Sequence, residues 1–315
     1  MPEYRAIRAK HSMLEVIQTP ELACQVTMQP VTTFQPDAAI IFADILTPLI
    51  GMGLKLDFIA GEGPRIFNPL STHQDIEALI VPPAEENAGY TLKAITMTAR
   101  ELEGHRTPLI GFSGAPFTLA AYAVEDQISD GLQKLKALMH KEPKSWELLQ
   151  RKLTKMVSEY LIAQAHAGAA ALQIFDSWVG ILSPADFRRS VLPWVKEVVA
   201  TVRAAVDVPI IYFGTNTAGL FPSYREIGAD VYGADWRIEL TDAADRIGGN
   251  PVMQGNLDPN LLFTDWATIE RAASAIIEQG RNLRGHIFNL GHGILPGTPV
   301  EHVAKLFSYV RSRTA

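Results

Sequence analysis

Eight short runs of apolar residues recur along the chain, and most are separated by stretches with the spacing of an amphipathic helix. The runs lie at residues 38–43, 54–58, 109–112, 171–175, 208–213, 230–233, 251–254 and 286–288. They are rich in Val, Ile, Leu and Phe and are largely continuous rather than alternating. Continuous apolar strands are typical of a parallel sheet that is buried on both faces. The pattern therefore predicts an α/β fold, and eight strands favour a (β/α)8 TIM barrel.

A doubly wound sheet is the alternative α/β architecture. However, no Gly-x-Gly-x-x-Gly motif follows the first predicted strand, as it would in a dinucleotide-binding fold. A chain of 315 residues could hold two domains, but α/β barrels reach this length as one. No linker or low-complexity segment interrupts the pattern, so we expect a single domain over residues 1–315.

Composition and charge narrow the possible partners. The sequence is 47% hydrophobic and 20% charged with a net charge of −6, so nothing global points to nucleic acid or to an anionic membrane. No apolar run reaches transmembrane length and the N-terminus lacks a signal-peptide core, which predicts no membrane partner and a cytoplasmic location. The single cysteine, Cys24, excludes an intrachain disulfide and a thiolate-rich metal site.

Small and polar residues gather directly after the predicted strands. In a barrel these positions share one mouth, where catalytic groups collect. The residues in question are Asp44, Ser113, Gly114, Asp176, Ser177, Gly214, Gly255, Asn256 and His292. Several small residues among them would leave room for a bulky ligand, so the pattern predicts a site at this mouth.

Asp44 and His292 stand out among these residues. Asp44 follows an apolar run and precedes Ile45 and Leu46, so its carboxylate is expected to be poorly solvated and to need a partner or a raised pKa. An N-cap role is the structural alternative. His292, flanked by two glycines, could act as a general acid or base, bind a carboxylate, or simply complete a turn.

The residues at this mouth also bear on two other kinds of ligand, a phosphate and a metal ion. The glycines around His292 and at Gly255 would suit a phosphate, so a phosphorylated substrate stays open at this point. A metal is disfavoured, because the sequence has no His-x-Cys motif and no Glu/His pair at helical ligand spacing.

Six sequence blocks in order carry a specific resemblance. They are Pro2-Glu3-Tyr4-Arg5, residues 39–46 (AIIFADIL), 111–118 (GFSGAPFT), 173–177 (QIFDS), 254–259 (QGNLDP) and 289–294 (NLGHGI). Through them the chain resembles the uroporphyrinogen decarboxylase family over nearly its whole length. The resemblance implies a cofactor-free, homodimeric carboxy-lyase of haem biosynthesis. It would remove carboxyl groups from the four acetate side chains of uroporphyrinogen, a tetrapyrrole, to give coproporphyrinogen.

The resemblance also implies roles for individual residues. Asp44 would be the central aspartate that binds the pyrrole N–H groups, and Tyr122, Ser177 and His292 would contact the substrate. A protonated pyrrole is the electron sink for loss of CO₂, and a buried aspartate would stabilise that cation. Because the substrate ring supplies this sink, neither a cofactor nor a metal is expected. The carboxylates of the substrate call for arginine at the rim, and Arg8 is the candidate, with Arg5 a weaker one.

The chain departs from the family at its start. The family carries an Arg-Gln-Ala-Gly-Arg-Tyr segment just upstream of Pro2, and its first arginine is a possible proton donor or carboxylate clamp. We expect an N-terminally shortened chain in which Met1 is an internal residue of a longer protein. One alternative is a tetrapyrrole-binding protein with impaired catalysis. The other is a zinc-dependent methyltransferase of the same superfamily, whose ligands include more than one cysteine.

Overall fold

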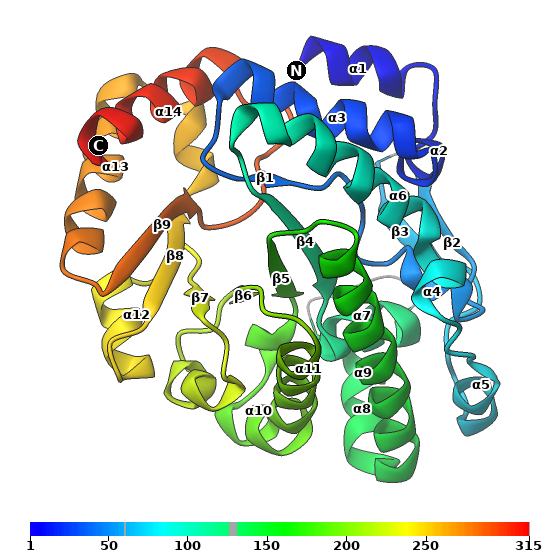
Figure 1. Ribbon diagram of the computed structural model, residues 1–315. Helices are drawn as coiled ribbons and strands as arrows, with labels where there is room; N and C mark the ends of the chain where they lie inside the picture. The colour runs from blue at the N-terminus through cyan, green and yellow to red at the C-terminus, as the bar shows by residue number, and fades with distance from the viewer. Residues whose placement is uncertain (60, 126–130, 315) are drawn as a thin grey trace.

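Seven parallel strands form one curved sheet in the computed structural model, which describes residues 1–59, 61–125 and 131–314 (Figure 1). In spatial order they are β1 (Ala39–Ile40), β4 (Leu109–Gly114), β5 (Ala171–Asp176), β6 (Ile210–Gly214), β7 (Val231–Gly233), β8 (Val252–Leu257) and β9 (Gly285–Leu290). Each strand pairs in parallel with the next, so all their carboxyl ends lie at one rim. The predicted α/β fold of the TIM-barrel type is confirmed.

Helices cover the outer side of this sheet (Figure 1). The longer ones are α3 (Pro20–Phe34), α6 (Ala84–Leu102), α9 (Pro143–His166), α11 (Leu192–Ala205), α13 (Trp266–Arg281) and α14 (Val300–Thr314). The shorter ones are α1 (Pro2–Arg8), α2 (Met13–Gln18), α4 (Pro48–Gly51), α5 (His73–Ala78), α7 (Pro116–Val124), α8 (Gln133–Lys141), α10 (Pro184–Ser190) and α12 (Leu240–Ile247). Short 3-10 helices are η1 (Glu103–His105), η2 (Val179–Ile181), η3 (Phe221–Ile227) and η4 (Pro259–Phe263).

Local sequence explains several of the helix starts. Ser12 and Glu15 form a reciprocal capping box at the start of α2, and Thr72 and Asp75 do the same for α5. Ser183 accepts the backbone N–H of Asp186 at the start of α10. These caps satisfy backbone donors that a helix cannot pair internally.

The second apolar run, residues 54–58, pairs differently from the prediction. It contributes β2 (Leu56–Ile59), which forms an antiparallel hairpin with β3 (Gly63–Ile66) and not a parallel barrel strand. Gly61 and Gly63 have φ of 82° and 91°, which allows the chain to turn back at once rather than cross over through a helix. Within the described residues the parallel sheet therefore has seven strands rather than eight, with β1 and β9 at its edges.

A buried glutamine fixes β4 to the helix layer. Gln164 of α9 accepts the backbone N–H of Phe112 and donates to the carbonyl of the same residue, both at 2.8 Å. The approach is close, because a Cβ on Gly111 would lie 2.5 Å from Gln164 Oε1. These two hydrogen bonds fix the position of β4, whose carboxyl end carries Ser113 and Gly114 at the rim.

Across the parts of the chain that the structure describes, none of the helices combines the length and the apolarity that a membrane span requires.

Candidate active site

Asp44 lies in the turn that follows β1, at the rim where the strands end. Its Oδ1 accepts the backbone N–H of Leu46 at 2.8 Å, and its carbonyl accepts Thr47 Oγ1 at 3.0 Å. Burial raises the pKa of the Asp44 carboxyl from 3.8 to about 6, against the lowering effect of the Leu46 amide. Among the described residues no cation pairs with it. The carboxylate thus caps one turn, but no cation of the described residues offsets its negative charge.

The charge of this carboxylate acts on tyrosine side chains from three helices. They are Tyr90 of α6, Tyr122 of α7 and Tyr160 of α9. Burial raises the pKa of each hydroxyl, and the negative charge of Asp44 adds to that rise. The structure therefore brings Asp44 and Tyr122, two of the predicted site residues, into one electrostatic environment.

Asp176, at the end of β5, ties α7 to the sheet. This fully buried carboxylate accepts Thr118 Oγ1 and the Tyr212 hydroxyl, each at 2.7 Å. Burial raises the pKa of Asp176 to about 6, and the two hydroxyl donors limit the rise. Thr118 lies one helical turn before Tyr122, so this contact orients the face of α7 that carries the tyrosine.

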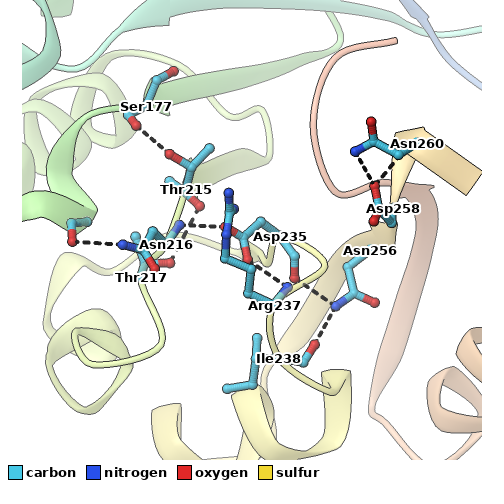
Figure 2. Close-up of polar contacts among 12 residues, drawn as sticks. Ser177, Thr215, Asn216, Thr217, Asp235, Arg237, Ile238, Asn256, Asp258 and Asn260 are labelled. Carbon is cyan, nitrogen blue, oxygen red and sulfur yellow. Dashed lines mark hydrogen bonds and ion pairs between the residues drawn. The ribbon is translucent and has the colours of Figure 1, made fainter. Parts of the chain in front are cut away.

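Ser177 lies directly after Asp176 and is half-buried. Its carbonyl accepts Thr215 Oγ1 at 2.5 Å, while its hydroxyl has no hydrogen-bond partner within the described residues (Figure 2). The next residue, Trp178, packs edge-on against Tyr122 with ring centroids 6.2 Å apart. Ser177 is therefore the chain neighbour of a residue that packs on Tyr122.

His292 is exposed after β9, and its ring meets the ring of Trp236 edge-on with centroids 6.5 Å apart. The preceding Gly291 donates its N–H to the Leu257 carbonyl at 2.7 Å. A Cβ on Gly291 would lie 2.6 Å from the backbone nitrogen of Trp236, so only glycine fits there. The close approach fixes the backbone that presents His292 at the rim.

The Arg8 side chain turns back onto its own chain. Its Nη1 donates to the His11 carbonyl at 2.5 Å, at the end of α1. Tyr4, one helical turn earlier, packs edge-on against Phe42 with centroids 5.7 Å apart, which places α1 beside the approach to Asp44. Arg5 is exposed and has no side-chain partner in the described part of the chain. No described contact joins either arginine to the other predicted site residues.

Three phenylalanine side chains form an aromatic cluster on one face of the sheet, which the sequence analysis did not predict. Phe112, Phe175 and Phe213 come from β4, β5 and β6 and contact each other edge-on at 5.5 and 6.1 Å. Gln173 and Gln254 point to the same face of the sheet as these phenylalanines. Their side chains are hydrogen-bonded at 3.5 Å although β5 and β8 are not neighbouring strands, so this face must be the inner face of the curved sheet. The signal was present as an aromatic residue on the same face near the end of three successive strands.

No group of three or more His, Cys, Asp or Glu side chains could hold a metal ion in residues 1–59, 61–125 and 131–314. A surface hollow of about 340 Å³ lies between α3 and α6, lined by Cys24, Met28 and Met97 among others. It is on the outer helix layer and includes none of the rim residues, so the chemistry is assigned to the rim by the side chains there.

Comparison with known proteins gives a consistent result. The sequence model of the family described as uroporphyrinogen decarboxylase (URO-D) matches residues 1–313. Uroporphyrinogen decarboxylase of Roseiflexus sp. (strain RS-1) is 50% identical, with 100% of this chain and 91% of that protein covered. The enzyme of that name from Chloroflexus aurantiacus is 51% identical, with 99% and 88% covered. A methyltransferase from Methanosarcina mazei has a similar fold, with a TM-score of 0.79 at 20% identity and with 96% and 88% of the two chains covered.

Proposed function

The chain belongs to the uroporphyrinogen decarboxylase family, and from that premise we propose how its own residues act on the substrate. The reaction is removal of CO₂ from the acetate side chains of uroporphyrinogen in tetrapyrrole biosynthesis. The observation that carries the proposed residue roles is the state of Asp44. It is a poorly solvated carboxylate at the rim, with one backbone amide as partner and no cation within the described residues.

The proposed chemistry uses the pyrrole ring as the electron sink. A proton adds to a ring carbon and leaves a cationic pyrrole. The bond between the acetate methylene and its carboxylate then breaks, CO₂ leaves, and the electron pair flows into the ring. A proton then adds to the methylene carbon and the ring proton is lost, so each cycle converts an acetate and one proton into a methyl group and CO₂.

Asp44 is proposed to stabilise the cation that forms in the first step. With a pKa of about 6 the carboxylate is mainly ionised at neutral pH, although burial disfavours the charge. A cationic ring offsets the desolvation cost of the Asp44 charge by direct charge attraction, whereas a neutral ring offsets it only by donating hydrogen bonds from its N–H groups. Stabilisation that is greater for the cation than for the substrate lowers the barrier.

The remaining predicted residues are proposed to hold the substrate. Tyr122, Ser177 and His292 would donate hydrogen bonds to substrate groups around Asp44, and Arg8 would meet a carboxylate at the rim. Phe112, Phe175 and Phe213 supply an apolar surface that suits the faces of pyrrole rings. Binding and orientation would therefore be separated in space from the single charge that acts on the reacting ring.

We propose a homodimer whose interface includes the loops beside this mouth. Phe263 and Ile294 are 48% and 54% exposed, and Gly297, in the loop that carries Ile294, lies close to the Phe263 ring. Exposed apolar groups gathered at one place favour a protein partner. A single domain over residues 1–315 and a cytoplasmic location complete the proposal. Ile294→Glu should convert a dimer to a monomer in light scattering, and an unchanged dimer would count against this surface.

The test of the function is an anaerobic incubation with uroporphyrinogen, with CO₂ and coproporphyrinogen measured. We expect turnover by the unaltered chain, near loss of turnover in Asp44→Asn, and full turnover in Asp207→Asn, an exposed aspartate on the far side of β6. Tight tetrapyrrole binding without CO₂ would support a binding protein instead. Equal rates for Asp44→Asn and the unaltered chain would remove Asp44 from the mechanism.

A further inference from the structure

We propose that Asp235 is a positioning residue that holds Ser177 and His292 in one fixed frame. The two residues follow strands β5 and β9, which are separated in the sheet by β6, β7 and β8. A substrate bound by both needs their spacing to be set before it arrives. The inference rests on the proposed function, because it takes Ser177 and His292 as substrate contacts.

Asp235 follows β7, between the two, and is only 3% exposed. Its Oδ2 accepts the backbone N–H of Asn216 at 2.5 Å and Arg237 Nη1 at 2.6 Å, while its Oδ1 accepts the backbone N–H of Arg237 at 3.0 Å. A buried carboxylate with three donors, one of them cationic, is strongly oriented. Asp235 thus joins the loop after β6 to the loop after β7.

On one side the connection leads to Ser177. Asn216, bonded to Asp235, follows Thr215, whose hydroxyl donates to the Ser177 carbonyl (Figure 2). The two loops touch tightly, because a Cβ on Gly180 would lie 2.1 Å from the Thr215 carbonyl oxygen. A shift of Asn216 would therefore move the backbone of Ser177.

On the other side the connection leads to His292. The Asp235 carbonyl accepts Asn256 Nδ2 at 2.9 Å, and the same amide group donates to the Ile238 carbonyl at 2.6 Å (Figure 2). Trp236 then contacts both the backbone at Gly291 and the ring of His292. The Arg237 guanidinium lies 4.1 Å from the Trp236 ring centroid, so the Asp235–Arg237 pair also orients that ring.

The chain offers a matched control at the other end of the same strand. Asp230 directly precedes β7 and accepts one backbone N–H, that of Ile210 at 2.8 Å, and one arginine, Arg203 Nη2 at 3.0 Å. It has one backbone donor fewer than Asp235, and its side chain is 39% exposed. Its position is the amino end of β7, remote from the rim. Asp230→Asn therefore removes a similar set of bonds without access to Ser177 or His292.

The kinetic test compares Asp235→Asn with Asp230→Asn. We expect Asp235→Asn to raise KM for uroporphyrinogen about tenfold, with kcat changed less than about threefold, because misplaced binding groups weaken substrate and transition state alike. Asp230→Asn should keep the unaltered KM even if its unfolding midpoint falls. The Asp235→Asn/His292→Ala double variant should lose less than the sum of the two single losses, since both changes act on the His292 contact while the effect through Ser177 remains. Equal KM values for the two Asp→Asn variants, or additive losses, would overturn the inference.

A second readout does not depend on turnover. The His292 imidazole Cε1–H resonance, assigned with His292→Ala, should shift and broaden in Asp235→Asn and stay in place in Asp230→Asn. Arg237→Gln, at an exposed position, removes the ion pair with Asp235 and gives the same test if Asp235→Asn does not fold. An unmoved His292 signal overturns the positioning role whether or not the protein releases CO₂. If the unaltered chain shows no turnover but the His292 resonance still shifts in Asp235→Asn, the proposed function is rejected and the positioning role of Asp235 stands.

Discussion

Replacing Asp44 by asparagine should make the protein more stable while it stops the reaction. Burial raises the pKa of this carboxyl from 3.8 to about 6 in the folded state. Because the folded pKa is the higher one, the group favours folding below pH 3.8 and that contribution is lost as pH rises through about 6. Asparagine is similar in size, can still accept the Leu46 amide, and carries no charge to desolvate.

The size of the gain follows from the shift. A difference between 3.8 and about 6 corresponds to about 3 kcal/mol once the carboxyl is ionised in both states. Linkage then gives Asp44→Asn an advantage of about 2 kcal/mol at pH 5 and about 3 kcal/mol at pH 7.5. The dependence on pH separates desolvation of a charge from any packing change, which would be constant.

Urea unfolding at the two pH values measures this advantage, with the anaerobic decarboxylation assay run on the same samples. Asp207→Asn serves as the control, because Asp207 is exposed and should give no gain at either pH. A loss of stability in Asp44→Asn at pH 7.5, or a gain that is the same at both pH values, would refute the reasoning. If Asp44→Asn is more stable and still turns over uroporphyrinogen, the charge of Asp44 is not needed for catalysis.

Three other predictions follow from single contacts. His292→Ala should raise KM more than it lowers kcat in steady-state assays, because we propose that the exposed ring binds the substrate at the rim; loss of kcat at constant KM would instead assign it a proton-transfer role. Gln164→Leu should cost about 3 kcal/mol in urea unfolding, because it leaves the Phe112 N–H and carbonyl unpaired. Gly291→Ala should lower kcat/KM by about tenfold and also lower the unfolding midpoint, since a Cβ 2.6 Å from the Trp236 backbone nitrogen would push that backbone away beside His292; unchanged kinetics would mean that this loop tolerates movement.

The parallel core of the fold could be predicted because each strand is a continuous apolar run, and seven of the eight runs became parallel strands. The run at residues 54–58 could not be assigned correctly from periodicity alone. Its composition suits a buried strand, but the partner was decided by Gly61 and Gly63, whose positive φ values make a hairpin possible. Turn geometry at two residues thus outweighed the repeated strand–helix pattern.

The position of Asp44 at the rim also followed from the sequence, because it directly succeeds an apolar run. The aromatic cluster and the Asp235 network did not. Phe112, Phe175 and Phe213 look like ordinary core residues until the strand register places them on one face, where their rings are in contact. The contacts of Asp235 join Asn216 and Asn256, residues 19 and 21 positions away in the chain, through backbone groups that no side-chain pattern marks.

Three carboxylates at this mouth explain why one of them is assigned the chemistry. Asp235 is neutralised by Arg237, and Asp176 accepts two hydroxyl groups, so the protein itself completes both environments. The Asp44 carboxylate accepts a single backbone N–H, so a bound ligand could supply the further donors or positive charge that the protein does not. Protein groups whose charge is satisfied internally fix geometry, whereas a charge held without a partner costs stability and persists for function. The same carboxylate chemistry therefore divides into two scaffold residues and the one residue that we propose to act on the substrate, according to the donors that each finds.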